Sequence, residues 1–131
     1  MNNILRFTIT GKPIGQARAR KGAYGNWYNP QSNLKNIIQK QIRDQLPHGF
    51  KMILSTVPII IDFRFYFKPL KSQKIVSAGD PYIKKPDGDN IEKLFTDSME
   101  KIVFSNDNHI YSSTWKKIYS DKEQTEIEVR W

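Results

Sequence analysis

Apolar and polar residues alternate along three segments of the chain, which is the pattern of strands that bury one face. These segments are residues 4–10, 57–67 and 125–131. Residues 109–119 also indicate a strand, although neither of its two faces is wholly apolar. Residues 120–123 lie between this strand and the last alternating segment, and we expect them to form a hairpin that joins the two.

Two other segments repeat apolar residues every three or four positions, as helices with one buried stripe do. The first stripe consists of Leu34, Ile37, Ile38, Ile42 and Leu46. Asn29 and Pro30 precede it as a cap residue and a proline at the first helical position, which predicts where this helix begins. The second stripe consists of Ile91, Leu94, Phe95, Met99 and Ile102.

These elements predict an α/β protein of the α+β type, with a single domain over residues 1–131 and the order β-α-β-α-β-β. We expect a mixed sheet of about four strands with two helices packed mainly on one face. The strand at 57–67 supports this arrangement, because one of its faces is apolar and the other is mixed. The mixed face consists of Ile60, Asp62, Arg64 and Tyr66.

Charge adds a partner class to this fold. The 131 residues contain 21 Lys and Arg against 13 Asp and Glu, a net charge of +8, and the pI is about 9.7. Such an excess favours a polyanionic partner such as nucleic acid, because neutralised phosphates release counterions.

The absence of cysteine excludes a disulfide framework or a zinc–cysteine site. The N-terminus lacks a signal-peptide pattern and the longest apolar segment, 57–61, is too short to span a bilayer, so we expect a cytoplasmic protein that binds no membrane.

Two basic segments are candidate DNA contacts. Residues 11–28 carry Arg18, Arg20 and Lys21 beside the rings of Tyr24, Trp27 and Tyr28. Cations with aromatics suit phosphate contacts supported by stacking, but a solvated loop whose rings fold back on the core fits the same residues equally well. The second segment, 68–85, contains Lys71, Lys84 and Lys85 directly before a group of acids, which favours contact with the DNA backbone.

Three aspartates are candidate metal ligands. Asp87 and Asp89 flank a glycine just after Pro86, where the second helix begins, and Asp107 precedes the next strand. Taken alone, the first two acids fit a helix cap and an i,i+4 pair between Asp89 and Lys93. The third acid favours convergence on a hard cation, because adjoining elements bring their ends together.

The residues around these acids resemble the signature of the RusA-like Holliday junction resolvases. Residues 86–93 read Pro-Asp-Gly-Asp-Asn-Ile-Glu-Lys, and Asp97 and the run Val-Phe-Ser-Asn-Asp-Asn-His-Ile at 103–110 follow. The family carries Asp-x-Asp-Asn, a lysine four residues after the second aspartate, and a final Asp-Asp-x-Gln-Val. This chain has Asn106 and His109 at two of those last positions, and Asp107 aligns with the second, metal-binding acid.

The resemblance implies roles for these residues. Asp87, Asp89 and Asp107 become the catalytic acids that bind Mg2+, with Mn2+ as a substitute, and Lys93 becomes the basic residue needed for cleavage. Asn90 matches the family's asparagine and contacts DNA or orients a ligand. The implied reaction is symmetric cleavage of four-way DNA junctions in recombination and repair by a homodimer.

Two other functions fit the residues as well. One is a basic nucleic-acid-binding protein without catalysis, whose acids only cap helices and form surface ion pairs. The other is a Mg2+-dependent nuclease that acts on flaps or other branched DNA.

Overall fold

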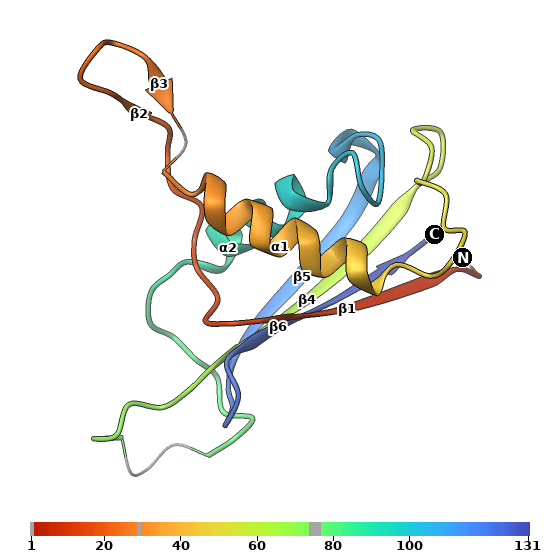
Figure 1. Cartoon of the computed structure of the whole chain (residues 1–131). Helices are drawn as coiled ribbons and strands as arrows, with labels where there is room; N and C mark the ends of the chain where they lie inside the picture. Colours follow the sequence, from red (N-terminus) through yellow and green to blue (C-terminus); the bar gives the residue numbers. More distant parts are fainter. Residues whose placement is uncertain (1, 29, 74–76) are drawn as a thin grey trace.

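The computed structural model describes residues 2–28, 30–73 and 77–131. Its centre is a four-stranded mixed sheet with the strand order β1-β6-β4-β5 (Figure 1). The strands are β1 (Ile4–Thr10), β4 (Ile59–Phe67), β5 (Ile110–Tyr119) and β6 (Gln124–Arg130). β6 pairs antiparallel with both β1 and β4, whereas β4 and β5 run parallel. The predicted mixed sheet is therefore confirmed.

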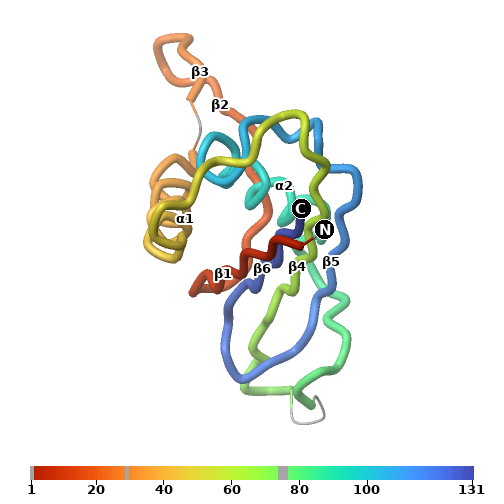
Figure 2. Tube along the Cα trace, turned by 90° about the vertical axis from the view of Figure 1, so that its right-hand side faces the viewer, coloured from red at the N-terminus to blue at the C-terminus, as the bar shows by residue number. Residues whose placement is uncertain are grey.

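The two helices cover one side of this sheet. In Figure 2, α1 (Ser32–Gln45) and α2 (Gly88–Met99) both lie above the row of strands. The described residues also form three short elements: β2 (Arg20–Lys21), β3 (Trp27–Tyr28) and the 3-10 turn η1 (Asp107–His109). Within the described residues β2 and β3 pair only with each other, so the segment predicted as a basic loop contains a small hairpin.

The core follows the predicted apolar faces closely. All five inward residues of β4 are at most 1% exposed: Ile59, Ile61, Phe63, Phe65 and Phe67. From α1, Ile38 and Ile42 join the same core, but Ile37 is 57% exposed, so its place in the buried stripe was predicted wrongly. The stripe seen in the sequence is wider than the part of α1 that reaches the sheet.

The start of α1 also differs from the prediction. The helix begins at Ser32, and Gln31 rather than Asn29 occupies the N-cap position. Asn29 itself lies outside the described residues. The predicted start at Pro30 is therefore two residues early.

The predicted hairpin between the last two strands is wrong. β5 and β6 follow each other in the chain, but β4 lies between them in the sheet. The connection at 120–123 therefore passes the end of β4, where the backbone N–H of Ser120 donates to Phe67 O at 2.9 Å. Alternation of apolar and polar residues defines which face of a strand is buried, but it does not determine which strands lie beside it in the sheet.

α1 also protects the free edge of the sheet. The side chain of Gln45 accepts a hydrogen bond from Thr8 N at 2.8 Å and donates one to Thr8 O at 2.9 Å. Gln41 Oε1 accepts from Thr10 N at 2.9 Å. Since β1 is an edge strand, these bonds occupy backbone groups that would otherwise pair with another chain.

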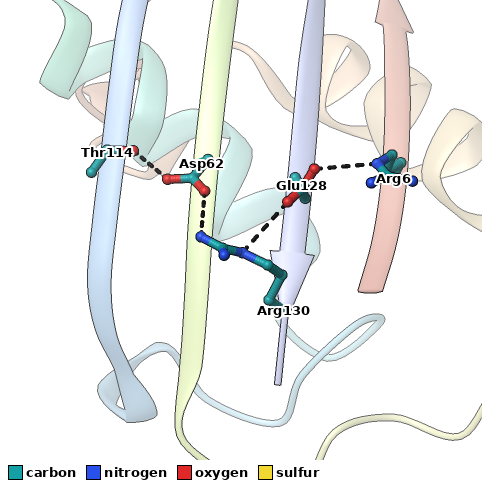
Figure 3. A network of polar contacts seen from close by, with 5 residues as sticks. All are labelled: Arg6, Asp62, Thr114, Glu128 and Arg130. Atoms are coloured by element: carbon teal, nitrogen blue, oxygen red, sulfur yellow. Dashed lines mark hydrogen bonds and ion pairs between the residues drawn. The ribbon is translucent and has the colours of Figure 1, made fainter. Parts of the chain in front are cut away.

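The opposite face of the sheet is polar and carries an ion-pair network (Figure 3). Arg130 binds Asp62 at 2.8 Å and Glu128 at 3.4 Å, while Glu128 also binds Arg6 at 3.2 Å. The hydroxyl of Thr114 donates to Asp62 as well. Together these contacts connect all four strands on the side without helices.

Neither helix in the described part of the chain has the length and the apolar character of a membrane-spanning segment.

Ile42 and Ile37 offer a matched test of this packing. Ile42→Ala removes a side chain that is fully buried, and we expect the free energy of unfolding to fall by about 2–5 kcal/mol. Ile37→Ala, on the exposed side of the same helix, should cost no more than about 0.5 kcal/mol. Urea denaturation of both variants measures this difference, and equal losses would contradict the placement of α1.

Candidate active site

Asp87 and Asp89 stand at the N-terminus of α2 with their side chains exposed. Asp87 occupies the N-cap position, yet its side chain makes no capping hydrogen bond. Within the described part of the chain, neither acid forms an ion pair with Lys93, which is itself exposed. Neither a side-chain cap of the helix nor an ion pair with Lys93 therefore explains these two acids.

Gly88, between the two acids, is buried under a side chain from β5. A Cβ atom at this position would lie 2.3 Å from the ring of Trp115, which is far inside van der Waals contact. Only glycine lets the indole pack this closely on the helix N-terminus. The contact fixes the start of α2, and with it both acids, against β5.

Hydrogen bonds also hold the loop that leads to Asp87. Lys117 Nζ, from β5, donates to Lys84 O at 2.6 Å and to Pro86 O at 2.8 Å. The hydroxyl of Tyr82 donates to Lys85 O at 3.1 Å. Burial is the main cause that raises the pKa of Tyr82 above its ordinary value. The backbone of 84–86 is thus bound to the sheet while the side chains of Lys84 and Lys85 stay exposed.

At the other end of α2, three acids come together. Asp97, Glu100 and Asp107 offer carboxylate oxygens that all lie within 4.8 Å of one another. A tight turn brings them together, in which Val103 N donates to Met99 O at 2.8 Å. Asp107 then opens η1. Three such carboxylates provide the oxygen donors that Mg2+ prefers.

Asn106 and His109, which replace an acid and a glutamine of the family motif, both have structural contacts at this turn. Asn106 Oδ1 accepts a hydrogen bond from Asn108 N at 3.0 Å and so caps η1. His109 Nδ1 lies 2.7 Å from Val57 O, in hydrogen-bond contact. Both contacts stabilise the turn that presents Asp107.

Gln16 connects the acid group to the N-terminal half of the chain. Its Nε2 donates to Asp97 Oδ2 at 2.9 Å, and its backbone N–H donates to Asn90 O at 3.0 Å. Gln16 Oε1 is buried and has no hydrogen-bond partner among the described residues. A hydrated cation at the acid group would give this oxygen a donor through its water.

The structure thus places the predicted acids at two ends of one helix. Asp107 lies in the group with Asp97 and Glu100, and neither Asp87 nor Asp89 belongs to that group. Asp97 lies eight positions after Asp89, which corresponds to about 12 Å along the helix axis. The metal-binding roles of Asp87 and Asp89 stay predictions.

Sequence reasoning missed Asp97 and Glu100 as partners of Asp107. Their spacing of three residues on a helix was a visible signal, because residues i and i+3 are neighbours on its surface. The turn after Met99, which brings Asp107 back to these two acids, could not be predicted from the sequence.

The predicted DNA contacts are all exposed. Arg18, Arg20 and Lys21 belong to the segment with β2, and Lys71 lies in the loop after β4. The aromatic residues beside β2 do not fold back on the core, since Tyr24 is 95% and Trp27 70% exposed. Of the two interpretations of this segment, the solvated loop with buried rings is therefore excluded.

The fold and the site together define a basic α+β domain with three grouped carboxylates, which are suitable ligands for a divalent cation. The chain belongs to the RusA family: the family model described as endodeoxyribonuclease RusA matches residues 10–130. It is also similar to the uncharacterized protein YqaN of Bacillus subtilis strain 168. The two are 25% identical over 138 aligned positions, which cover 96% of this chain and 95% of YqaN.

The contact between Gly88 and Trp115 can be tested by stability. Gly88→Ala places a methyl group in the indole ring, and we expect the free energy of unfolding to fall by about 1–3 kcal/mol. In a Trp115→Ala background the clash is absent, so the same change should be neutral or stabilising. Urea denaturation of the four proteins gives both costs, and equal costs in the two backgrounds would show that the ring is not the cause.

Proposed function

We propose that the protein is a Mg2+-dependent, structure-specific endonuclease that resolves Holliday junctions by symmetric paired nicks in DNA recombination and repair. The observation that carries this proposal is the group of Asp97, Glu100 and Asp107 in a chain of the RusA family. Carboxylates this close repel one another, and a divalent cation removes the repulsion. The donor set is therefore suited to Mg2+, with Mn2+ as a substitute of similar ligand preference.

Asp107 belongs both to the acids of the motif and to the acids that lie close together in the structure. The RusA-like motif assigns the metal to Asp87, Asp89 and Asp107, whereas distance groups Asp107 with Asp97 and Glu100. We propose Asp87, Asp89 and Asp107 as the catalytic acids, with Asp107 in the observed group of carboxylates and the other two at the opposite end of α2. Asp97 and Glu100 are further oxygen donors beside Asp107.

Asp107, with Asp97 and Glu100 beside it, would hold Mg2+, which would supply activation of water and stabilisation of the leaving 3′ oxygen. Lys93 has a separate task on the same helix. Its ammonium group is exposed and makes no ion pair in the described ranges, so it is available to offset charge on the reacting phosphate.

Exposed cations in other segments of the chain would contact the DNA backbone. These cations are Arg18, Arg20, Lys21, Lys71, Lys84 and Lys85. Asn90 stands beside Asp89 with an exposed side chain, and its amide is available to DNA or to a metal-bound water. Phosphate contacts of this kind position branched DNA without reading its sequence.

A homodimer completes the proposal. Paired nicks at symmetric positions need two active sites, and a two-fold dimer supplies both with the symmetry of a four-way junction.

Single substitutions separate the two sets of acids. We expect Asp107→Asn to lower the rate of junction cleavage in Mg2+ by about 100-fold or more, the scale on which loss of one electrostatic stabiliser lowers kcat. Asp89→Asn tests the acids of the motif, and Asp97→Asn tests the group at the other end of α2. Asp44→Asn is the matched control: this exposed acid pairs with Lys40 on α1 and should leave the rate within about twofold.

Junction binding, measured by fluorescence anisotropy in EDTA, accompanies each cleavage assay. Lost cleavage with retained binding supports an enzyme. Full activity in all three site variants contradicts the assignment. Binding without any cleavage by the unaltered protein, in Mg2+ or Mn2+, identifies a DNA-binding protein, and preferred cleavage of flaps at the same salt identifies a flap nuclease.

A further inference from the structure

Residues 18–28, called the arm below, project from the body of the protein. Figure 1 shows the hairpin of β2 and β3 extending beyond the N-terminus of α1, and Figure 2 shows it clear of the sheet from a second side. Two backbone bonds close its tip, from Gly22 N to Asn26 O at 2.7 Å and from Gly25 N to Gly22 O at 3.0 Å. A two-stranded hairpin of this length has little stability of its own. Packing within the protein therefore does not explain why the arm has cationic and aromatic residues.

The arm exposes three large rings to solvent. Tyr24 is 95%, Trp27 70% and Tyr28 50% exposed. Tyr and Trp side chains bury a large area when they have a partner, and a protein gains nothing in its own stability by leaving three of them in water. Their exposure within one short segment indicates that they contact another molecule.

The register of the hairpin pairs each strand ring with a cation. Arg20 lies opposite Tyr28, and Lys21 lies opposite Trp27. Directly opposed residues share a face of the ladder and successive residues alternate between faces. Each face of the arm therefore carries one positive charge beside one aromatic ring.

The charge around the arm selects the kind of partner. Residues 1–43 contain eight Lys and Arg and no acid, whereas residues 44–131 contain 13 of each. The whole net charge of +8 thus lies in the part of the chain that includes the arm. A polyanion with accessible aromatic faces, which is to say a nucleic acid with unstacked bases, satisfies both the cations and the rings.

Hydrogen bonds fix the base of the arm beside the acids. Gln16 binds Asn90 and Asp97 of α2 through the bonds given above, and Gln31 Oε1 accepts from Ala17 N at 2.7 Å. Gln31 Nε2 also donates to Gly15 O at 2.8 Å. DNA held by the arm is consequently held close to α2.

We propose that the arm binds DNA bases that have a free face by stacking on Trp27 and Tyr28, with Arg20 and Lys21 on the flanking phosphates. Bases inside a linear duplex already stack on one another, and only a branch point or a single strand offers a free base face to a side chain. The arm therefore selects branched over linear DNA at the proposed site. This selection rests on the proposed function, whereas the stacking itself does not require cleavage.

The test compares three DNA probes at equal salt in EDTA: oligo-dT, a four-way junction and a linear duplex. We expect Trp27→Ala to weaken binding to oligo-dT and to the junction by about tenfold, within the range that one stacked base contributes. Binding to the duplex should not change. Trp27→Phe, which keeps a ring, should restore most of the affinity. Tyr111→Ala removes a ring that is 63% exposed on β5 and serves as the matched control without effect.

Salt dependence separates stacking from charge. Trp27→Ala should leave the slope of log Kobs against log salt unchanged, whereas Lys21→Ala should lower it by about 0.7 on single strands, the value for one lost phosphate contact. Equal weakening on all three probes, or a changed slope for Trp27→Ala, would overturn the stacking proposal. So would unchanged DNA binding with a weaker dimer in sedimentation, because the arm would then be a protein contact. Since these measurements need no catalysis, an inactive protein that still shows the Trp27 effect would disprove only the nuclease.

Discussion

The packing of α2 against β4 is the contact on which the rest of the structure depends. The ring of Phe95 lies 6.1 Å from that of Phe65 and 6.5 Å from that of Phe63, and Ile91 and Met99 are fully buried at either side. Because these contacts extend along the whole helix, neither of its ends is free to move independently. The acids at both ends of α2 are therefore held in place by an apolar core that contains none of them.

Charge is arranged around that helix in a way that stability alone would not favour. Three carboxylates lie together at its C-terminal end, and an arm with an excess of positive charge starts beside it. Gln16 links the two features through its bond to Asp97. A cation bound at the acids reduces the repulsion between their carboxylates, and a phosphate backbone bound along the arm reduces the repulsion between its cations.

Much of this fold was predictable from periodicity, because burial on one face imposes it directly. The strand at Ile4–Thr10 and the inward face of β4 lie where the alternation placed them. Periodicity does not determine neighbours, and so the insertion of β4 between β5 and β6 was not visible. It also overstated the buried stripe of α1 at Ile37, since a helix at the sheet edge buries fewer positions.

The candidate site was predictable in part for a similar reason. The motif identified Asp87, Asp89, Lys93 and Asp107 by spacing. The grouping of Asp107 with Asp97 and Glu100 depends on an aperiodic turn that returns the chain to α2. Likewise, the sequence could not decide whether the rings of the basic segment were buried, because stacking residues and core residues are the same types.

Strand-resolved mapping of nicks on a synthetic four-way junction, with each strand labelled in turn, tests directly whether the protein resolves junctions. In Mg2+ we expect nicks of equal rate at symmetry-related positions in two opposing strands, and none in EDTA. Nicks in a single strand, nicks scattered over the arms, or equally fast cleavage of a linear duplex would contradict a junction-resolving enzyme.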